Sequence, residues 1–341
     1  LPKTQLLQLI REAARLWLED RAGLLAAGES LTAHLRQKEQ TRPGAPSREL
    51  IRQAASQFAQ SFDERWGGFG PAPKFPTPHN LIFLLRYARL TGYSHAREMA
   101  LQTLDAMYRG GLFDHVGGGF SRYSTDERWL VPHFEKMLYD NALLALACTE
   151  AFQHTHRPLY GQVVRRTLDY VLRELSGPQG GFCCGQDADS EGVEGKYYVL
   201  TPDELARALG GPDAECFCRW YGITREGNFE GKSIPNLLGQ AQFDQEPEGM
   251  AVLRERVYAY RLSRTVLHRD DKVLMAWNGL ALAALARAGL VLDEPRYLDA
   301  AHRTADFLAA KLTAPDGRLL ARWRYGDAAH SGKLDDYAFY A

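Results

Sequence analysis

The chain of 341 residues carries 41 Lys and Arg against 42 Asp and Glu, which gives a formal net charge of −1. Because no stretch concentrates Lys and Arg, the composition excludes the electrostatic footprint of a protein that binds nucleic acid or an anionic membrane. The longest apolar run, at about 280–292, is broken by Arg287 and is shorter than the roughly 20 residues needed to cross a bilayer. We therefore expect a soluble, cytoplasmic protein whose partner is a small molecule.

The five cysteines do not form a disulfide framework or a zinc-binding pattern. Cys183 and Cys184 are adjacent, Cys216 and Cys218 are two apart, and Cys148 stands alone. No pair has the C-x-x-C spacing of a zinc or redox site. A reducing compartment is therefore expected, with no metal and no cofactor. The opening residues also lack the basic and apolar regions of a secretory signal.

The first predicted helices follow one another with short turns. Ser47 is placed to cap a helix in which Leu50, Ile51, Ala54, Phe58 and Phe62 fall on one face. This helix ends at the glycine-rich segment 66–70. After a proline-rich bridge at 71–78, an apolar helix is predicted at 81–90. Its partner runs from about residue 94 to the glycines at 110–111.

A second group of helices occupies the middle and the end of the chain. Pro132 suits the first turn of a helix that runs to about residue 155, and Pro158 begins a neighbour that runs to about residue 175. The segment 196–200 alternates as a short strand would, and Thr201 and Glu204 form a capping box for the next helix. Further helices are predicted at 213–220, 248–264, 272–289 and 295–312, and from about residue 334.

Repeated helical hairpins with long loops predict an all-α fold. An open solenoid and a closed toroid both satisfy this pattern. The loops are long, and they are aromatic or acidic on one side of each hairpin, as in folds where loops line a funnel-shaped pocket. This favours an (α/α)6 toroid of the six-hairpin kind, with strands confined to short ribbons in the loops.

The stretch 110–142 contains the first group of candidate functional residues. A helix beginning at Pro132 would place His133 in its first turn and on one face with Lys136 and Asp140. The positive end of the helix dipole would favour a neutral imidazole, able to accept a proton. Glycines at 117–119 would hold His115 and Arg122 nearby. The alternative is structural, because Lys136 and Asp140 form an i,i+4 pair and a buried histidine often bonds only a backbone carbonyl.

The loop 185–198 carries a run of acidic residues. Asp187, Asp189 and Glu191 alternate like the opening of a calcium loop, but the glycine and glutamate that such a loop needs are misplaced. Crowded carboxylates raise one another's pKa and can supply a general acid. Equally, they can cap the following turn. The sequence leaves both interpretations open.

Two further stretches place polar residues at predicted helix starts. Asn278 falls on an apolar helix face and must find a hydrogen-bonding partner, and Trp277 beside it is either a stacking platform for a sugar or part of the core. Asp335 and Asp336 stand at the start of the last helix, where capping alone would explain either of them.

Together these stretches resemble the family of thioredoxin-domain proteins related to the spermatogenesis-associated protein. The matching segments are 66–69, 73–76, 111–123, 132–141, 187–198, 272–279 and 334–339, so the resemblance covers the chain from about residue 50 to its end. It implies an N-terminal thioredoxin-like domain in cis, followed by a six-hairpin toroid similar to N-acylglucosamine 2-epimerase. On this resemblance, residues 1–45 are expected to be a connector helix and linker, and 46–341 a toroid that lacks its last part.

The resemblance also implies a pocket for a carbohydrate-like ligand. In related epimerases two histidines move a proton beside a carbonyl, so His115 and His133 are proposed as that pair by role. Asp140, Asp187 and Asp189 complete the predicted catalytic set. The residues expected to bind substrate are Arg122, Tyr123, Glu135, Lys136, Glu191, Trp277, Asn278, Asp335, Asp336 and Tyr337.

Two other functions fit the same residues. A glycoside hydrolase would need two carboxyl groups on either side of the scissile bond, with Asp187 or Asp189 facing Asp335 or Asp336. A non-catalytic module that presents the thioredoxin-like domain would instead show an apolar groove, with its acidic residues engaged in capping.

Overall fold

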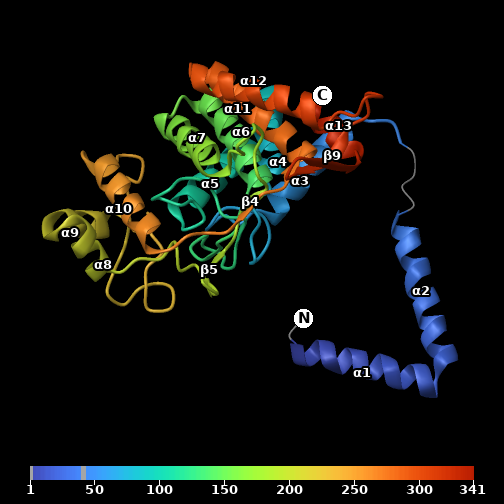
Figure 1. Ribbon diagram of the computed structural model, residues 1–341. Helices are drawn as coiled ribbons and strands as arrows, with labels where there is room; N and C mark the ends of the chain where they lie inside the picture. Colours follow the sequence, from blue (N-terminus) through green and yellow to red (C-terminus); the bar gives the residue numbers. More distant parts are fainter. Residues whose placement is uncertain (1–2, 40–43) are drawn as a thin grey trace. The chain divides into compact units, whose positions relative to one another are not determined.

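The computed structural model describes residues 3–39 and 44–341, which are drawn as a ribbon in Figure 1. The chain divides into two compact units, Leu1–Gln53 and Ala54–Ala341. The first unit holds helices α1 (Lys3–Glu19) and α2 (Arg21–Glu39), and none of the side chains described in either helix is buried. The connector that is expected at 1–45 stays a prediction.

The second unit is built from helical hairpins. Helix α3 (Arg48–Ser61), which begins in the first unit and ends in the second, precedes the pair α4 (Pro78–Thr91) and α5 (Ser94–Arg109). The next pair is α6 (Leu138–Thr155) and α7 (Pro158–Tyr170), and α7 continues as the π-helix η1 (Val171–Leu175). The last pair is α11 (Met275–Val291) and α12 (Pro295–Lys311), followed by α13 (Leu334–Tyr340). The amide of Leu50 donates to the hydroxyl of Ser47, as the predicted cap requires.

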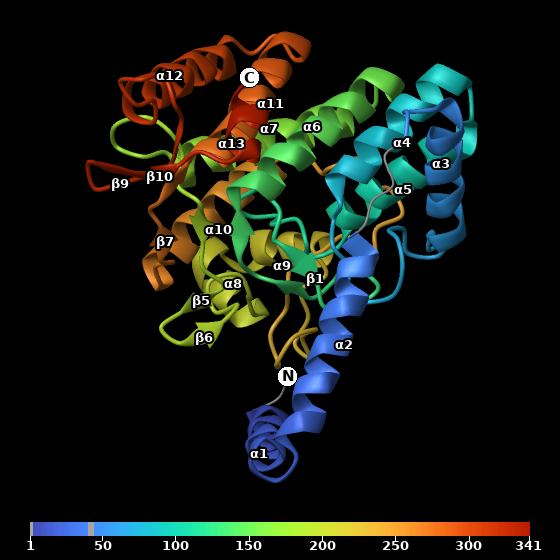
Figure 2. The same ribbon diagram turned by 90° about the vertical axis from the view of Figure 1, so that its right-hand side faces the viewer.

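Helix contacts arrange these hairpins as part of a ring. Helices α4, α6, α11 and α13 pack side by side in this order, and α5, α7 and α12 each pack on the first helix of their own hairpin (Figure 2). Helices α6 and α11 contact neighbours on several sides and bury most of their surface. A helix that is buried on most sides is apolar around most of its circumference, and these two are rich in alanine and leucine. The predicted all-α toroid of hairpins is confirmed, and the described residues supply three hairpins and a further inner helix.

An additional helical group interrupts the ring between η1 and α11. It contains α8 (Pro202–Leu209), α9 (Gly211–Trp220) and α10 (Met250–Arg264), which contact one another. The predicted capping box at the start of α8 is confirmed, since the amide of Glu204 donates to the Thr201 hydroxyl and the Thr201 amide donates to the Glu204 carboxylate.

Short strands join the loops at one side of the hairpins. Strand β1 (Tyr123–Ser124) pairs with β2 (Pro132–His133), and β5 (Asp189–Ser190) pairs with β6 (Val193–Glu194). Strand β4 (Gly185–Gln186) lies between β3 (Lys136–Met137) and β7 (Arg269–Asp270). Strand β9 (Leu320–Arg324) lies between β8 (Val273–Leu274) and β10 (Asp327–Ser331). The confinement of strands to the loops agrees with the expectation.

Two sequence-based element predictions are wrong. Helix α6 begins at Leu138 rather than at Pro132, because the preceding residues are held in strands: His133 pairs with Tyr123, and Lys136 pairs with Gln186. His133 is therefore not in the first turn of a helix. The strand predicted at 196–200 is also absent, because residues 195–198 form a turn and the nearby strand is β6.

No helix in the described parts of the chain is both long enough and apolar enough to cross a membrane.

Candidate functional site

Each of the two central inner helices holds an earlier loop through one asparagine near its N-terminus; for α6 this loop directly precedes the helix, and for α11 it is the loop that follows η1. The Asn141 Oδ1 accepts from the amide of Phe120 at 2.7 Å, and its Nδ2 donates to the Phe120 carbonyl oxygen at 3.0 Å. The Asn278 Oδ1 accepts from the amide of Phe182 at 2.7 Å, and its Nδ2 donates to the carbonyl oxygens of Phe182 and Leu274. Asn278 is fully buried. The role of Asn278 is therefore structural, and the predicted contact with substrate is not available, because its amide already bonds the backbone of Phe182 and Leu274.

The N-terminal residues of α13 repeat this arrangement with other side chains. The hydroxyl of Tyr337 accepts from the amide of Leu319 at 3.1 Å. Asp336 is buried and accepts from the amides of Ala276 and Lys333, at 3.0 and 2.8 Å. Its carboxylate therefore caps two helices, α11 and its own. Asp335 is exposed. The capping interpretation holds for Asp336, which is buried and bonded through both of its oxygens.

The loss of the Asn278 amide should weaken the fold measurably. In Asn278→Ala the Phe182 amide and carbonyl are left buried without partners, which costs about 1–3 kcal/mol for each group. We expect the free energy of unfolding to fall by at least about 2 kcal/mol in urea denaturation. The matched variant Asn80→Ala, in which a partly exposed asparagine on α4 is truncated, should change it by less than about 0.5 kcal/mol. Equal stabilities for the two variants would contradict this assignment.

His115 lies inside the protein rather than in a cavity. Its side chain is 1% exposed and packs edge-on against Tyr108 and Phe113. One ring nitrogen, Nε2, lies 3.2 Å from the carbonyl oxygen of Gly110. Burial, and then the positive charge of Arg166, lower the pKa of His115 to about 3. A substrate would have to open the core to reach this imidazole, so its place in a catalytic pair is not supported by its position.

Lys136 is likewise buried, in what we call the Asp114 cluster: Asp114, Lys136 and Arg261. The Lys136 ammonium donates to Asp114 Oδ2 at 2.8 Å and to the Gly118 carbonyl oxygen at 2.7 Å. The guanidinium of Arg261, from α10, binds both oxygens of Asp114 at 3.0 and 2.8 Å. All three side chains are nearly inaccessible to water. This cluster therefore fastens the loop 112–121 to α10, and the predicted contact of Lys136 with substrate is not available.

Other predicted residues do gather where β1, β2 and the start of α6 meet. We call this group the polar cluster: Arg122, Tyr123, His133, Glu135, Tyr139 and Asp140. The guanidinium of Arg122 donates to Glu135 Oε2 at 2.9 Å, and the same oxygen lies 3.7 Å from His133 Nε2. The rings of Tyr123 and His133 lie with their centroids 5.2 Å apart. The cluster thus combines a carboxylate, a guanidinium and an imidazole within a few ångströms.

Asp140 is the most unusual member of the polar cluster. It is 7% exposed, and its Oδ2 is buried with no hydrogen-bond partner in the described structure. Burial raises the pKa of this carboxyl to about 7, although Tyr139 and the positive charge of Arg122 act in the opposite direction. At neutral pH the group is therefore divided between its acid and its base form. Such a carboxyl has the acidity that general acid catalysis needs.

Aromatic rings flank the polar cluster on two sides. The ring of Trp277, from the first turn of α11, lies 4.7 Å from that of Tyr139. On the other side Phe75, which is 53% exposed, stacks on Tyr123 at 4.8 Å. Trp277 is half-buried and also packs against the hydrophobic core, as its core interpretation expects, and its use as a stacking platform for a sugar stays a prediction.

The acidic loop contributes a different residue from those predicted. Glu194, on β6, lies 2.9 Å from His133 Nδ1 and therefore reaches the polar cluster. Asp187 and Asp189 are exposed, and Asp187 pairs instead with His268 at 3.3 Å. Glu191 binds Lys196 and the hydroxyl of Thr265. The three predicted acids thus do not converge with His133. Glu194 lies outside the predicted set, because nothing in the sequence indicates the β5–β6 hairpin that carries it.

Within the described residues, no three His, Cys, Asp or Glu side chains are placed to hold a metal ion.

No protein-family model matches the chain. Human "Spermatogenesis-associated protein 20" is 38% identical over an alignment that covers 95% of the chain and 48% of that protein. Its mouse counterpart is 37% identical, with 83% of the chain and 42% of the relative covered. An uncharacterised protein of Caenorhabditis elegans is 31% identical, with 86% and 46% covered. The chain therefore spans about half the length of the curated relatives that it matches.

Similarity to solved structures is weaker. The Lin0763 protein from Listeria innocua superposes with a TM-score of 0.45 at 14% identity, covering 84% of the chain and 57% of that protein. A variant of an alpha-1,6-mannanase of Salegentibacter gives a TM-score of 0.42 at 12% identity, covering 80% and 73%. The cellobiose 2-epimerase from Spirochaeta thermophila gives 0.35 at 15% identity, covering 86% and 96%.

Proposed function

The chain belongs, over the segment that it matches, to the family of spermatogenesis-associated protein 20, and on that premise we propose that its toroid binds a sugar and moves a proton on it. The site is the polar cluster together with Trp277. The observation that carries this proposal is Asp140, a buried carboxyl with an unpartnered oxygen and a pKa of about 7 beside an aromatic pair.

The proposed chemistry is epimerase- or isomerase-like. His133 holds its Nδ1 proton toward Glu194, which leaves Nε2 as the nitrogen that accepts a proton in the neutral ring. Asp140 supplies the acid, and the Arg122–Glu135 ion pair orients the polar groups of the ligand. Trp277 and Tyr139 form the apolar wall against which the sugar ring packs. In this proposal His133 is the base and Asp140 is the acid, the two roles for which the sequence suggested His115 and His133.

A glycoside hydrolase is the second candidate, and one observation favours it. The negative charge of Glu135 contributes to the raised pKa of Asp140, while Arg122 pairs with Glu135. A carboxyl that retains its proton near a second carboxyl group is the arrangement that a glycosidase needs. The pair proposed from the sequence is less suitable, because Asp336 is engaged in capping.

Two other parts of the proposal rest on the resemblance alone. The parent protein carries a thioredoxin-like domain in cis, before the connector at residues 1–45. The ligand of the toroid is a small carbohydrate in the cytoplasm. A scaffold without catalysis is the alternative, and it predicts that no sugar binds.

Calorimetric titration of the chain with a panel of monosaccharides and disaccharides tests binding. We expect Trp277→Ala to weaken the affinity by roughly tenfold, because an aromatic contact contributes about 1–2 kcal/mol. Trp17→Ala, on α1 in the other compact unit, is the matched control and should leave the affinity unchanged. Absence of heat with every sugar would instead support the scaffold.

The two reactions are distinguished by their products. Incubation of a bound sugar in D2O, followed by NMR, detects deuterium at the carbon beside the carbonyl if a proton is exchanged there. Hydrolysis instead releases new reducing ends from a disaccharide. His133→Ala should abolish the exchange, whereas His268→Ala, an exposed histidine that pairs with Asp187, should not. Equal exchange by both variants would exclude His133 as the base.

A further inference from the structure

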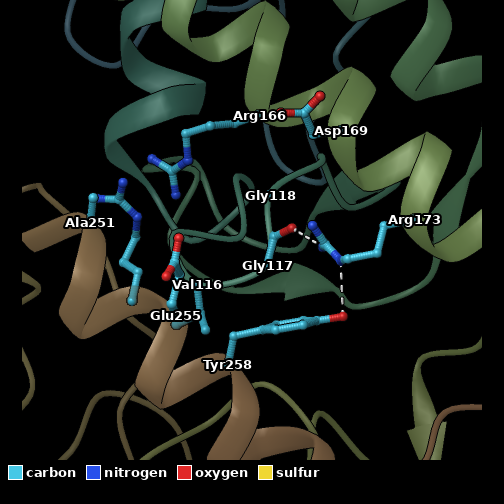
Figure 3. A pocket seen from close by; sticks show the side chains of 10 residues that line it. Val116, Gly117, Gly118, Arg166, Asp169, Arg173, Ala251, Glu255 and Tyr258 are labelled. Atoms are coloured by element: carbon cyan, nitrogen blue, oxygen red, sulfur yellow. Dashed lines mark hydrogen bonds between the residues drawn. The ribbon is translucent and has the colours of Figure 1, made fainter. Parts of the chain in front are cut away.

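A cavity of about 280 Å³ lies on another part of the toroid unit, between α7, α10 and the loop that contains Gly117 and Gly118 (Figure 3). It shares no lining residue with the polar cluster. Three arginines line it: Arg166 and Arg173 come from α7 and η1, and Arg254 comes from α10. Helix α10, which lies outside the series of hairpins, therefore forms one wall of a cationic cavity.

The three guanidinium groups differ in their hydrogen-bond and ion-pair partners. Arg173 donates to the Gly117 carbonyl oxygen and the Tyr258 hydroxyl, and it pairs with Glu174. Arg254 pairs with Glu246, which is not part of the cavity lining. Arg166 donates to the His115 carbonyl oxygen at 2.6 Å and lies over the ring of Phe113, and no ion pair among the described residues includes it. Figure 3 shows its side chain extending from α7 toward α10.

Arg166 therefore forms no ion pair with a carboxylate of the described residues, although Asp169 and Glu255 line the same cavity. Its planar guanidinium has five N–H donors; one binds the His115 carbonyl oxygen and another faces the Tyr108 hydroxyl. Burial is the main cause of the lowered pKa of His115, and the positive charge of Arg166 is the second. The charge of Arg166 therefore acts on a neighbouring side chain. A half-buried guanidinium with unused donors is suited to a planar or tetrahedral oxyanion.

The other residues that line the cavity are compatible with an anion, except for the carboxylate of Glu255. Of the two acids, Asp169 is engaged by Arg296 at 2.8 Å and by the hydroxyl of Tyr297. Glu255 is exposed on α10 and forms no ion pair within the described residues. The floor cannot carry side chains, because a Cβ on Gly118 would lie 2.3 Å from the Arg166 carbonyl oxygen. A small anionic group would therefore meet the backbone at Gly118, the guanidinium of Arg166 and the carboxylate of Glu255.

A second cavity, of about 530 Å³, shares Arg166 and Arg254 with the first. It adds Gln162 and Arg165 to the polar surface around the two shared arginines, and it also contains the carboxylates of Asp244 and Glu246, of which Glu246 pairs with Arg254. This negative charge makes the first cavity, rather than the second, the candidate for an anion.

We propose that the cavity between α7, α10 and the loop 116–118 binds the oxyanion group of a small metabolite, a phosphate monoester or a carboxylate, through Arg166. The site is separate from the polar cluster, so it stands whether or not the toroid acts on a sugar. The expected ligand is an anion, although the net charge of the protein as a whole is close to zero.

Calorimetric titration of the chain at low ionic strength tests the site. The probes are inorganic phosphate, glycerol phosphate and malonate, so that the first two report a phosphate ligand and the third a carboxylate ligand. We expect one of these two classes of probe to bind. Arg166→Gln should weaken that binding at least about tenfold, because it removes one charge-assisted, bidentate contact. Arg303→Gln, on α12 outside this cavity, is the matched control.

A second variant covers the case in which Arg166→Gln disturbs packing. Glu255 is exposed, so Glu255→Gln keeps the fold, and by removing a negative charge from the edge it should tighten anion binding by about two- to fivefold. The proposal is overturned if no probe binds at concentrations on the order of 10 mM, the range of a very weak site. It is also overturned if Arg166→Gln binds as tightly as Arg303→Gln, or if Glu255→Gln fails to tighten binding.

Discussion

Replacing Asp114 with alanine is expected to lower the free energy of unfolding by about 3–5 kcal/mol, because it leaves two buried cations without their counter-ion. Lys136 and Arg261 both bind the Asp114 carboxylate, and each side chain is only 2% exposed. The carboxylate also accepts from the amides of Val116 and Gly117. Urea denaturation of the chain, followed by far-ultraviolet circular dichroism, measures the loss.

The pH dependence of stability gives an independent check on Asp114. Burial alone would raise the pKa of this carboxyl, but Arg261 and Lys136 hold it well below its usual range. A folded-state pKa below the unfolded one contributes stability that is present at neutral pH and is lost as the pH falls through the folded value. Asp187→Ala, at an exposed aspartate, is the control and should change stability by less than about 0.5 kcal/mol. An Asp114→Ala variant as stable as this control would refute the structural role of Asp114.

Replacing Asp140 with asparagine is expected to reduce turnover of a bound sugar by about 10²- to 10⁴-fold, the contribution of one positioned acid. The asparagine keeps the shape of the side chain but cannot exchange a proton. If Asp140 is the acid, the activity of the unchanged chain should fall as the pH rises above its pKa of about 7. Initial rates measured from about pH 5 to about pH 9, a range that brackets this pKa, report both effects.

The same substitution should stabilise the protein at high pH. The folded-state pKa of Asp140 is raised, so its contribution to stability is most favourable below the unfolded pKa and is lost as the pH rises toward about 7. A tenfold change in the acid dissociation constant corresponds to about 1.4 kcal/mol, so Asp140→Asn should be more stable than the unchanged chain by roughly 2–4 kcal/mol at about pH 8. At about pH 4 the difference should be small, because the folded chain then keeps its proton. A variant that loses activity and stability together would show that Asp140 is structural.

The sequence predicts helices well where a cap and an apolar stripe agree. Ser47, Ser94, Pro158 and Thr201 mark helix starts that the structure places within a residue or two. The prediction fails at the start of α6, because Pro132 satisfies the rules for a first helical turn and also those for the first residue of an edge strand. Two-residue strands are too short for any period to be read from them, and the pairing of His133 with Tyr123 depends on contacts between separate segments.

The candidate site is recovered only in part for the same reason. The grouping of Arg122, His133, Glu135 and Asp140 can be predicted because these residues are close in sequence. Glu194 cannot, because it reaches His133 from a hairpin 61 residues away. Arg261 does leave a signal in the sequence: it follows the buried Val257 by four residues, so a cation lies on the apolar face of α10 and requires a buried partner.

The asparagine on each central inner helix, and the tyrosine that replaces it on α13, have a consequence for how this protein can change. Each of these helices fastens an earlier segment of the chain to its own N-terminal turn, through Phe120, Phe182 or Leu319. Lengthening the chain between Phe182 and Asn278 would leave this attachment in place, because both of its hydrogen-bonding residues lie outside the added segment. The connection between these two residues already carries the three helices α8, α9 and α10, so a long excursion of the chain is compatible with the attachment of α11.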